Sequence, residues 1–481
     1  MIEKRDFYIN GAWVAPLAPR DHQVINPSTE EPCAVISLGS EADADRAVQA
    51  ARAAFPAWMA TDPAYRIGLV EKFLEIYERR REEMAQAMSM EMGAPITMSR
   101  ASQWGAGFSH TKNFLRAAKD FQFVRPLGDH APNDRIVYEA VGVCALITPW
   151  NWPMNQVTLK VIAALIAGCT MVLKPSEESP LNALLFAEMM DEAGVPAGVF
   201  NLVNGDGPGV GTALSGHPEV DMVSFTGSTR AGIAISANAA RTLKKVHLEL
   251  GGKGANLIFA DADEKAVKRG VLHMMNNSGQ SCNAPSRMLV ERSRYDAAVE
   301  EAAAVAASVT VGPASEEGRH IGPVVNATQF EKIQGLIQKG IDEGARLVAG
   351  GTGRPEGFNR GFFVRPTVFA DANNDMTIAR EEIFGPVLTI MPFDSEEEAL
   401  AIANDTPYGL TNYVQTANPE RANRFARALR SGMVEMNGHS RGAGAPFGGM
   451  KASGNGREGG TWGLEDFLEV KSVSGWDALP A

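Results

Sequence analysis

Strand-like and helix-like segments alternate along most of this chain, which restricts the folds open to it. From residue 135 to 250, short runs rich in Val, Ile and Leu are separated by segments with apolar residues at helical spacing. The pattern predicts strands at 135–140, 142–148, 169–173, 198–203, 220–225 and 244–250, with helices at 154–167, 180–193, 208–215 and 229–240. Strands alternating with helices of this length indicate a parallel sheet wound on both faces.

A second alternating region runs from residue 255 to about 436, with helices expected near 263–276, 293–308 and 327–343. The first part of the chain shows helical patterns instead, at 42–58, 64–92 and 97–119. A chain of 481 residues is long enough for two or three domains. We therefore expect an α/β protein with two doubly wound units.

Two strand-like segments, 121–139 and 467–474, belong to neither alternating region. The unpaired edge of a strand has to be covered or paired. A subunit interface is one interpretation, and a hairpin within one chain is the other.

Composition excludes several classes of function. A net charge of −12 opposes binding to nucleic acid. The cysteines and histidines show no CxxC or HxxxH spacing, so we expect no metal site and no disulfide framework. The N-terminus lacks the apolar core of a signal peptide, and the longest apolar run, 161–173, is too short to cross a bilayer. The sequence predicts a cytoplasmic protein without a membrane partner.

The stretch from Asn276 to Pro285 is polar, is interrupted by glycine and contains the single thiol of Cys282. Small polar neighbours would leave this thiol within reach of a substrate, as a nucleophile requires. The alternative is a buried cysteine that acts as a small hydrophobic residue.

Two further polar residues stand where a strand ends. Glu249 closes an apolar strand before a glycine pair, and a desolvated carboxylate there suits a general base. A structural glutamate that caps the next turn is the alternative. Asn151 lies in the rigid turn Thr148–Pro153, where its amide either stabilises an oxyanion or caps the following helix.

Three loops are candidates for binding a dinucleotide. The turn 205–211 lacks the third glycine of GxGxxG, because Val210 takes that place. The segment 225–229, FTGST, leads from a strand into a helix whose N–H groups suit a pyrophosphate. Glu177, in the KPSE stretch, would bind ribose hydroxyls and repel a 2′-phosphate, which favours NAD and makes NADP the weaker alternative.

Seven motifs occur in the order in which the aldehyde dehydrogenase superfamily has them: TPWNWP, KPSE, FTGST, LELGGK, GQSC, EEIFGPV and PFGGMKASGNGRE. The chain therefore resembles that superfamily over essentially its whole length. The resemblance implies a Rossmann-type NAD-binding domain (1–120 and 140–251, with about 445–463) and a catalytic domain (252–444). It also implies β segments (121–139 and 464–481) that join subunits into a homodimer or homotetramer.

The resemblance also assigns roles to residues. It implies Cys282 as nucleophile, Glu249 as general base, Asn151 as oxyanion donor and Lys160 as a proton-relay partner. Lys174 and Glu177 match the adenosine-ribose contacts, Gly227 and Ser228 the pyrophosphate turn, and Glu382 and Phe384 the nicotinamide-ribose side. The other implied cofactor contacts are Ile147, Thr148, Pro149, Trp150, Ser176, Gly207, Gly211, Phe225, Thr226, Leu250 and Gly251.

The implied reaction oxidises an aldehyde to a carboxylic acid through a thiohemiacetal and a thioester on Cys282, and Glu249 activates the hydrolytic water. The alternatives are a CoA-acylating enzyme, whose resembling members lack the general-base glutamate, a cofactor-independent hydrolase, and a non-catalytic protein with the same fold. The implied substrate contacts are Trp152, Gln156, Leu159, Ser281, Asn283, Arg441 and Phe447.

His439 and Arg441 fall where many relatives place apolar residues. A cation there would favour an acidic aldehyde, such as a semialdehyde. A surface arginine on a loop is the alternative.

Overall fold

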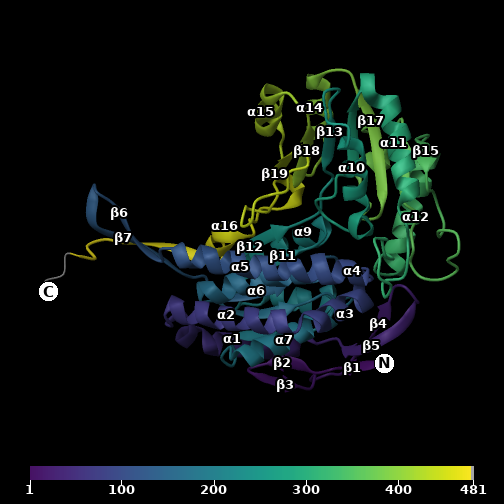
Figure 1. Cartoon of the computed structure of the whole chain (residues 1–481). Coiled ribbons are helices and arrows are strands. Elements are labelled where there is room, and N and C mark those ends of the chain that lie inside the picture. Colours follow the sequence, from purple (N-terminus) through teal and green to yellow (C-terminus); the bar gives the residue numbers. More distant parts are fainter. Residues whose placement is uncertain (478–481) are drawn as a thin grey trace.

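Two seven-stranded sheets, each packed between helices, make up most of the computed structural model, which describes residues 1–477 (Figure 1). The first sheet has the order β12-β11-β8-β9-β10-β2-β3. Its strands are β2 (Phe7–Ile9), β3 (Ala12–Val14), β8 (Val143–Ile147), β9 (Thr170–Lys174), β10 (Phe200–Leu202), β11 (Met222–Thr226) and β12 (Lys245–Glu249). The chain moves outward from β8 to β10 and then returns to β11 beside β8. The strand order therefore reverses between β8 and β11, which is where ligands bind in such sheets.

The second sheet has the order β15-β16-β17-β14-β13-β18-β19. Its strands are β13 (Ala255–Ile258), β14 (Arg287–Glu291), β15 (Arg346–Ala349), β16 (Thr367–Ala370), β17 (Val387–Phe393), β18 (Thr411–Gln415) and β19 (Met433–Met436). All neighbours are parallel except the edge strand β15, which is antiparallel to β16. The expectation of two doubly wound α/β units is confirmed.

Helices cover both sheets. The longer ones are α1 (Glu41–Met59), α2 (Pro63–Arg79), α3 (Arg81–Met92), α5 (Trp104–Asp120), α6 (Pro153–Ala167), α7 (Leu181–Ala193), α9 (Thr229–Ala239), α10 (Ala266–Met275), α11 (Tyr295–Ser308), α12 (Ala327–Asp342), α14 (Glu396–Asn404) and α15 (Pro419–Ala428). Shorter ones are α4 (Ile96–Met98), α8 (Thr212–Gly216), α13 (Thr377–Arg380) and α16 (Gly460–Glu465).

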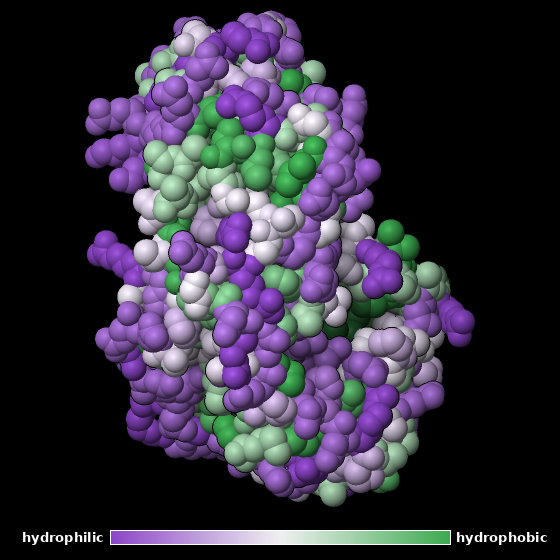
Figure 2. Space-filling model, turned by 90° about the vertical axis from the view of Figure 1, so that its right-hand side faces the viewer, coloured by the Kyte–Doolittle hydropathy of each residue, from purple (hydrophilic) through white to green (hydrophobic). Residues whose placement is uncertain are grey.

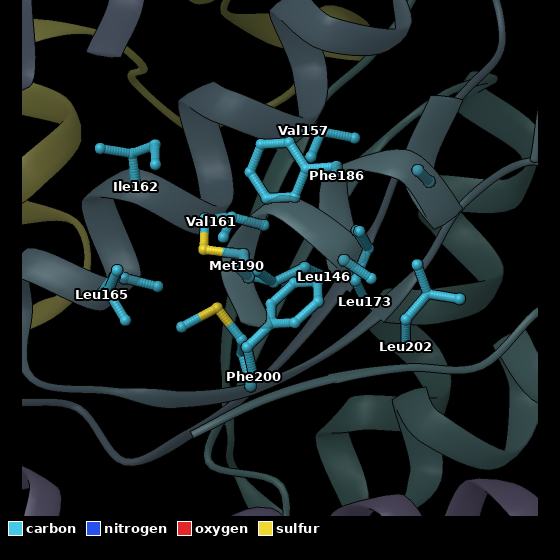
Figure 3. Close-up of a cluster of buried hydrophobic side chains, with 14 of the residues drawn as sticks. Leu146, Val157, Val161, Ile162, Leu165, Leu173, Phe186, Met190, Phe200 and Leu202 are labelled. Carbon is cyan, nitrogen blue, oxygen red and sulfur yellow. The ribbon is translucent and has the colours of Figure 1, made fainter. Parts of the chain in front are cut away.

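Helix α6 is mostly apolar and is buried along nearly its whole length. Figure 3 shows its side chains packed with those of α7 and of strands β8, β9 and β10; the labelled members are Leu146, Val157, Val161, Ile162, Leu165, Leu173, Phe186, Met190, Phe200 and Leu202. Burial of each such side chain contributes roughly 1.5–3 kcal/mol. This core fixes α6, and with it the turn that carries Asn151.

A third sheet projects from the body and contains β6 (Val124–Gly128), β7 (Ala131–Ala140) and β20 (Leu468–Val473), in the order β20-β7-β6 (Figure 1). The two segments left over by the sequence pattern thus pair with each other within one chain. Val470 and Val124 on the outer strands are 64% and 46% exposed. Assembly through this sheet stays a prediction, and residues 478–481 of the predicted segment lie outside the described part of the chain.

The sequence pattern suggested helices for the first part of the chain, but the structure also has strands there. It begins with β1 (Ile2–Lys4), β2 and β3, followed by β4 (Asp21–Asn26) and β5 (Glu31–Ser37). Strands of three residues are too short to show alternation, but the two-residue loop Asn10-Gly11 between β2 and β3 is a strong hairpin signal that was missed. Both of its residues have positive φ, at 54° and 74°.

The face seen from the right of Figure 1 is mostly hydrophilic, with hydrophobic residues gathered in its upper half (Figure 2). Helix α12 and the edge strand β15 lie on this side and carry the partly exposed Ile341 and Leu347. Within residues 1–477, no helix is both long enough and apolar enough to span a bilayer.

Candidate active site

A cavity of about 230 Å³ opens at the carboxyl ends of β8, β11 and β12, where the strand order of the first sheet reverses. The second sheet contributes its other wall, through the cysteine loop and the loop before β17. The lining residues are Pro149, Trp150, Asn151, Gln156, Thr226, Gly227, Ser228, Glu249, Leu250, Gly251, Cys282, Gln329, Lys332, Glu382 and Phe384. The structure thus brings together the three residues expected to carry the chemistry: Cys282, Glu249 and Asn151.

Cys282 is half-buried and follows a strained turn. Asn277 and Ser278 have φ values of 50° and 56°, a left-handed conformation that most side chains avoid but Asn tolerates. The Ser278 hydroxyl donates to the Gly322 carbonyl oxygen at 2.7 Å, which holds the turn. Burial, followed by the Glu382 and Glu249 carboxylates, raises the pKa of the Cys282 thiol. The resting thiol is therefore protonated at neutral pH.

Asn151 is fixed by hydrogen bonds at both its side chain and its backbone. Its Nδ2 donates to the Gln280 carbonyl oxygen at 2.9 Å. Its own carbonyl oxygen accepts from Asn277 Nδ2 at 2.8 Å and from Gln103 Nε2 at 3.2 Å. Helix α6 begins at Pro153 without a side-chain cap, so capping is not what this amide does. A second N–H of the same amide remains to act in the cavity.

Glu249 ends β12 and is 2% exposed. Neither of its carboxylate oxygens has a hydrogen-bond partner among the described residues, so the carboxylate caps no turn there. Burial first and the nearby Glu458 second raise its pKa well above the ordinary value, while Lys160 and Arg457 oppose this shift. A carboxylate with such a pKa is a stronger base than an exposed one.

Lys160 does not line the cavity and is instead bound to two other side chains. It is fully buried, and its Nζ donates to Glu458 Oε1 at 2.6 Å and to Ser224 Oγ at 3.1 Å. Glu458 was missed, although it is the last residue of the motif PFGGMKASGNGRE. It is joined to Phe447 by two backbone hydrogen bonds, of 2.7 and 2.8 Å. Lys160 and Glu458 therefore form a buried ion pair whose charges act on Glu249.

The strand β11 and the start of α9 have the features of a phosphate-binding turn. Ser228 caps α9, its Oγ accepting from the Ala231 N–H at 3.3 Å. The buried hydroxyl of Thr226, which lines the cavity, has no partner among the described residues. A helix N-terminus and an unpaired buried hydroxyl beside a glycine fit a dinucleotide phosphate. Phe225 packs beneath Gly227, where no side chain would fit.

The end of β9 holds the residues expected at the adenosine ribose. Lys174 Nζ donates to the carbonyl oxygens of Gly205 and Pro175 and meets Glu177 Oε2 at 3.4 Å. The Glu177 side chain is 29% exposed, so its carboxylate is free to accept hydrogen bonds from ribose hydroxyl groups. The other expected residues of this region are Ile147 and Thr148 at the end of β8, Ser176 in the turn after β9, and Gly207 and Gly211 in a wide turn before α8. That wide turn replaces the first half of the helix expected at 208–215.

Glu382 and Phe384 lie on the opposite side of the cavity. Glu382 Oε1 accepts from the Gly252 N–H at 2.9 Å, and Phe384, at φ 59°, meets Trp150 edge-on with ring centroids 5.5 Å apart. Two residues of α12 that lie outside the sequence motifs hold this loop. Gln329 Nε2 donates to the Phe384 carbonyl oxygen at 2.8 Å, and Lys332 Nζ donates to that of Glu382 at 2.9 Å.

The expected substrate residues are not all in the cavity. Gln156 lines it, and the Trp152 indole N–H donates to Ser281 Oγ at 2.8 Å. Asn283 contributes its carbonyl oxygen to the Tyr413 hydroxyl at 2.6 Å. Leu159, a residue of α6, is 2% exposed and packs in the core.

Arg441 is not a free cation. Its Nε meets Glu435 Oε1 at 3.2 Å, and its guanidinium lies 4.6 Å from the centroid of the Phe447 ring. His439 is exposed. Within residues 1–477, no group of three or more His, Cys, Asp or Glu side chains is arranged to hold a metal ion.

Comparison with known proteins places this site in a family. The model named "Aldehyde dehydrogenase family" matches residues 13–473. A Pseudomonas protein named 3-succinoylsemialdehyde-pyridine dehydrogenase is 52% identical over 479 residues, which cover 99% of this chain and 100% of that protein.

Solved structures agree with this result. An aldehyde dehydrogenase from Bartonella henselae has a TM-score of 0.98 at 60% identity, covering 98% of this chain and 100% of that chain. An aldehyde dehydrogenase C mutant from Pseudomonas syringae, in complex with NAD+ and octanal, has a TM-score of 0.96 at 49% identity, covering 99% and 97%. With the family model matched from residue 13 to 473, the chain belongs to the aldehyde dehydrogenase family.

Proposed function

We propose that this enzyme uses NAD to oxidise an aldehyde to its carboxylic acid, through a covalent intermediate on Cys282. The observation that carries the proposal is the presence of Cys282, Asn151 and Glu249 in the lining of one cavity. A nucleophile, an oxyanion donor and a base in one enclosed space are what acyl transfer requires.

In the first half of the reaction, the Cys282 sulfur adds to the aldehyde carbon and the thiol proton passes to water. The developing oxyanion accepts from Asn151 Nδ2 and from the backbone N–H of Cys282, each such donor being worth about 3 kcal/mol. NAD, when bound, supplies the acceptor for the hydride. The enzyme is then left as a thioester on Cys282.

In the second half, Glu249 takes a proton from a water molecule, which attacks the thioester carbonyl. The carboxylic acid leaves and the Cys282 thiol is restored. The unpartnered, buried carboxylate of Glu249 is suited to this step, because its raised pKa makes it a good proton acceptor. Asn151 again stabilises the oxyanion.

The residues present fit NAD. Ser228 and the start of α9 would hold the pyrophosphate, and Lys174 and Glu177 the adenosine ribose. Glu382 and Phe384 would contact the nicotinamide side. The negative charge of Glu177 favours a free 2′-hydroxyl over a 2′-phosphate, so NADP is the weaker cofactor.

The alternatives fit the site less well. A CoA-acylating enzyme needs no general base, whereas Glu249 is buried in the cavity without another partner there. A hydrolase without a cofactor leaves the Thr226–Ser228 turn and the Lys174–Glu177 pair without a role. A non-catalytic protein would not keep a thiol, a base and an oxyanion donor together.

The relatives named above are described with a pyridine semialdehyde and with octanal. We infer an aldehyde as the substrate of this chain as well. An acidic aldehyde was inferred from Arg441 as a free cation, and the Glu435 contact removes that argument.

A panel of aldehydes with NAD and with NADP, followed by the absorbance of the reduced cofactor, tests the proposal. Wild type should reduce NAD, and C282A should not. Mass spectrometry of E249Q, mixed with aldehyde and NAD, should show one acyl group on Cys282. A folded wild type that reduces neither cofactor with any aldehyde would refute the function.

A further inference from the structure

A series of neighbouring residues leads from Cys282 toward Glu249, and the cofactor contacts do not use it. The Tyr413 hydroxyl donates to the carbonyl oxygen of Asn283, the residue after Cys282, at 2.6 Å. Tyr413 in β18 is the register partner of Glu435 in β19, so their side chains lie on the same face of the second sheet. Glu435 therefore lies beside the loop that carries the nucleophile.

The series continues from Glu435 toward the general base. Arg441 Nε donates to Glu435 Oε1 at 3.2 Å, and the Arg441 guanidinium stacks over the Phe447 ring at 4.6 Å. Phe447 is bound through its backbone to Glu458, whose charge acts on Glu249. Arg441 is also close enough to Cys282 to lower the pKa of its thiol. The Glu435–Arg441 pair thus lies close to the reacting groups, although neither residue lines the cavity that holds them.

The two charges of this pair compensate each other. The side chains are 13% and 31% exposed, so solvent screens them only in part. Arg441 Nη1 contacts Met433 Sδ at 3.2 Å, while Nη2 has no protein partner within residues 1–477. The pair therefore offers one free N–H donor group but no net positive charge.

We propose that Glu435 and Arg441 select uncharged aldehydes whose tail accepts a hydrogen bond, such as ketone, ester or heteroaromatic tails, over aldehydes that carry a carboxylate. The proposal rests on the function proposed above and specifies its substrate class. An uncharged acceptor can take the free Nη2 donor without disturbing the ion pair. A carboxylate would bring a second negative charge next to Glu435 in a poorly screened space.

The test compares two probes of the same chain length, succinic semialdehyde and its methyl ester, as substrates with NAD. Wild type should show a kcat/KM for the ester at least about tenfold above that for the acid, as expected for like charges brought together. Equal values, or a preference for the acid, would overturn the proposal. If neither probe nor any other aldehyde reduces NAD, the failure lies with the proposed function instead.

The variant E435Q removes the negative charge and leaves Arg441 free to pair with the acid. The ester-to-acid ratio should fall below that of wild type, through a lower KM for the acid. The variant R441Q should raise the KM of the ester, with little change for octanal, which has no acceptor. E300Q, on an exposed position of α11, is the matched control and should keep the wild-type ratio. An ester-to-acid ratio in E435Q equal to that of wild type would also overturn the proposal. If E435Q does not fold, the wild-type ratio and the KM of the ester in R441Q still decide the proposal.

Discussion

The side-chain amide of Asn277 donates to the backbone carbonyl oxygen of Asn151 across 2.8 Å. The same Nδ2 also reaches the Gln280 carbonyl oxygen at 3.3 Å, and that oxygen accepts from Asn151 Nδ2 as well. One asparagine, held at φ 50°, therefore fastens the loop of the nucleophile to the turn of the oxyanion donor. The relative position of thiol and amide depends on this bridge.

Substitution at Asn277 should separate the effect of the bridge from that of the backbone conformation. N277A loses both the amide and the tolerance of positive φ, whereas N277G loses only the amide. We expect kcat to fall by about 100-fold in both, since a small misplacement of reacting groups costs that much. KM for NAD should change little. Steady-state kinetics of the two variants checks this, and wild-type kcat in N277G would show that the bridge has no catalytic effect.

Replacing Glu249 by Gln should stop the reaction after its first half. The thiol and the oxyanion donor remain, so one equivalent of reduced cofactor should form rapidly per active site. Turnover should then fall by about 100-fold or more, because general-base catalysis is lost. Stopped-flow absorbance measures the burst, with E264Q on the exposed surface as the matched control. A variant without a burst would place Glu249 in the first half instead.

The same variant should be more stable than wild type at neutral pH. Folding raises the pKa of Glu249, so the folded state holds this proton more tightly than the unfolded state does. The stability of wild type therefore falls as the pH rises from the ordinary carboxyl pKa toward the raised one. E249Q lacks this titration, so its advantage in melting temperature over wild type should grow from about pH 4 to about pH 8. The lower pH is close to the ordinary carboxyl pKa, and the higher one is well above it. An advantage that shrinks with pH would contradict the assignment of the raised pKa.

The Lys160–Glu458 pair should shift the pH dependence of turnover in two directions. Lys160 lowers the pKa of Glu249, so K160M should move the acid limb of the kcat profile to higher pH. Glu458 raises that pKa, so E458Q should move the limb to lower pH. Each variant leaves one buried charge unpaired, at a cost of about 3–5 kcal/mol, so the profiles are best measured at low temperature. Shifts of the same sign in both variants would indicate a structural effect alone.

The sequence predicted the two wound sheets because their central strands are apolar runs of about five residues between amphipathic or mostly apolar helices. It missed β1 to β3, which are three residues long and show no periodicity. It also missed β4 and β5, which are six and seven residues long. The motifs brought Cys282, Glu249 and Asn151 together by family resemblance. Glu458, Gln329 and Glu435 were missed, because their roles come from contacts between residues far apart in the chain or on different elements. Sequence patterns report local structure and leave such contacts unseen.

The carboxylate of Glu382 should control how readily Cys282 is alkylated. After burial, its charge is the largest cause of the raised thiol pKa, so E382Q should lower that pKa. At a fixed neutral pH a larger share of the thiol is then ionised, and iodoacetamide should react faster, because the thiolate is the nucleophile. The adjacent Glu381 is exposed and is not among those causes, so E381Q should react at the wild-type rate. Mass spectrometry of Cys282 over time measures both rates. If E382Q reacted more slowly than E381Q, Glu382 would be stabilising the thiolate, and the electrostatic account of this site would have to be reversed.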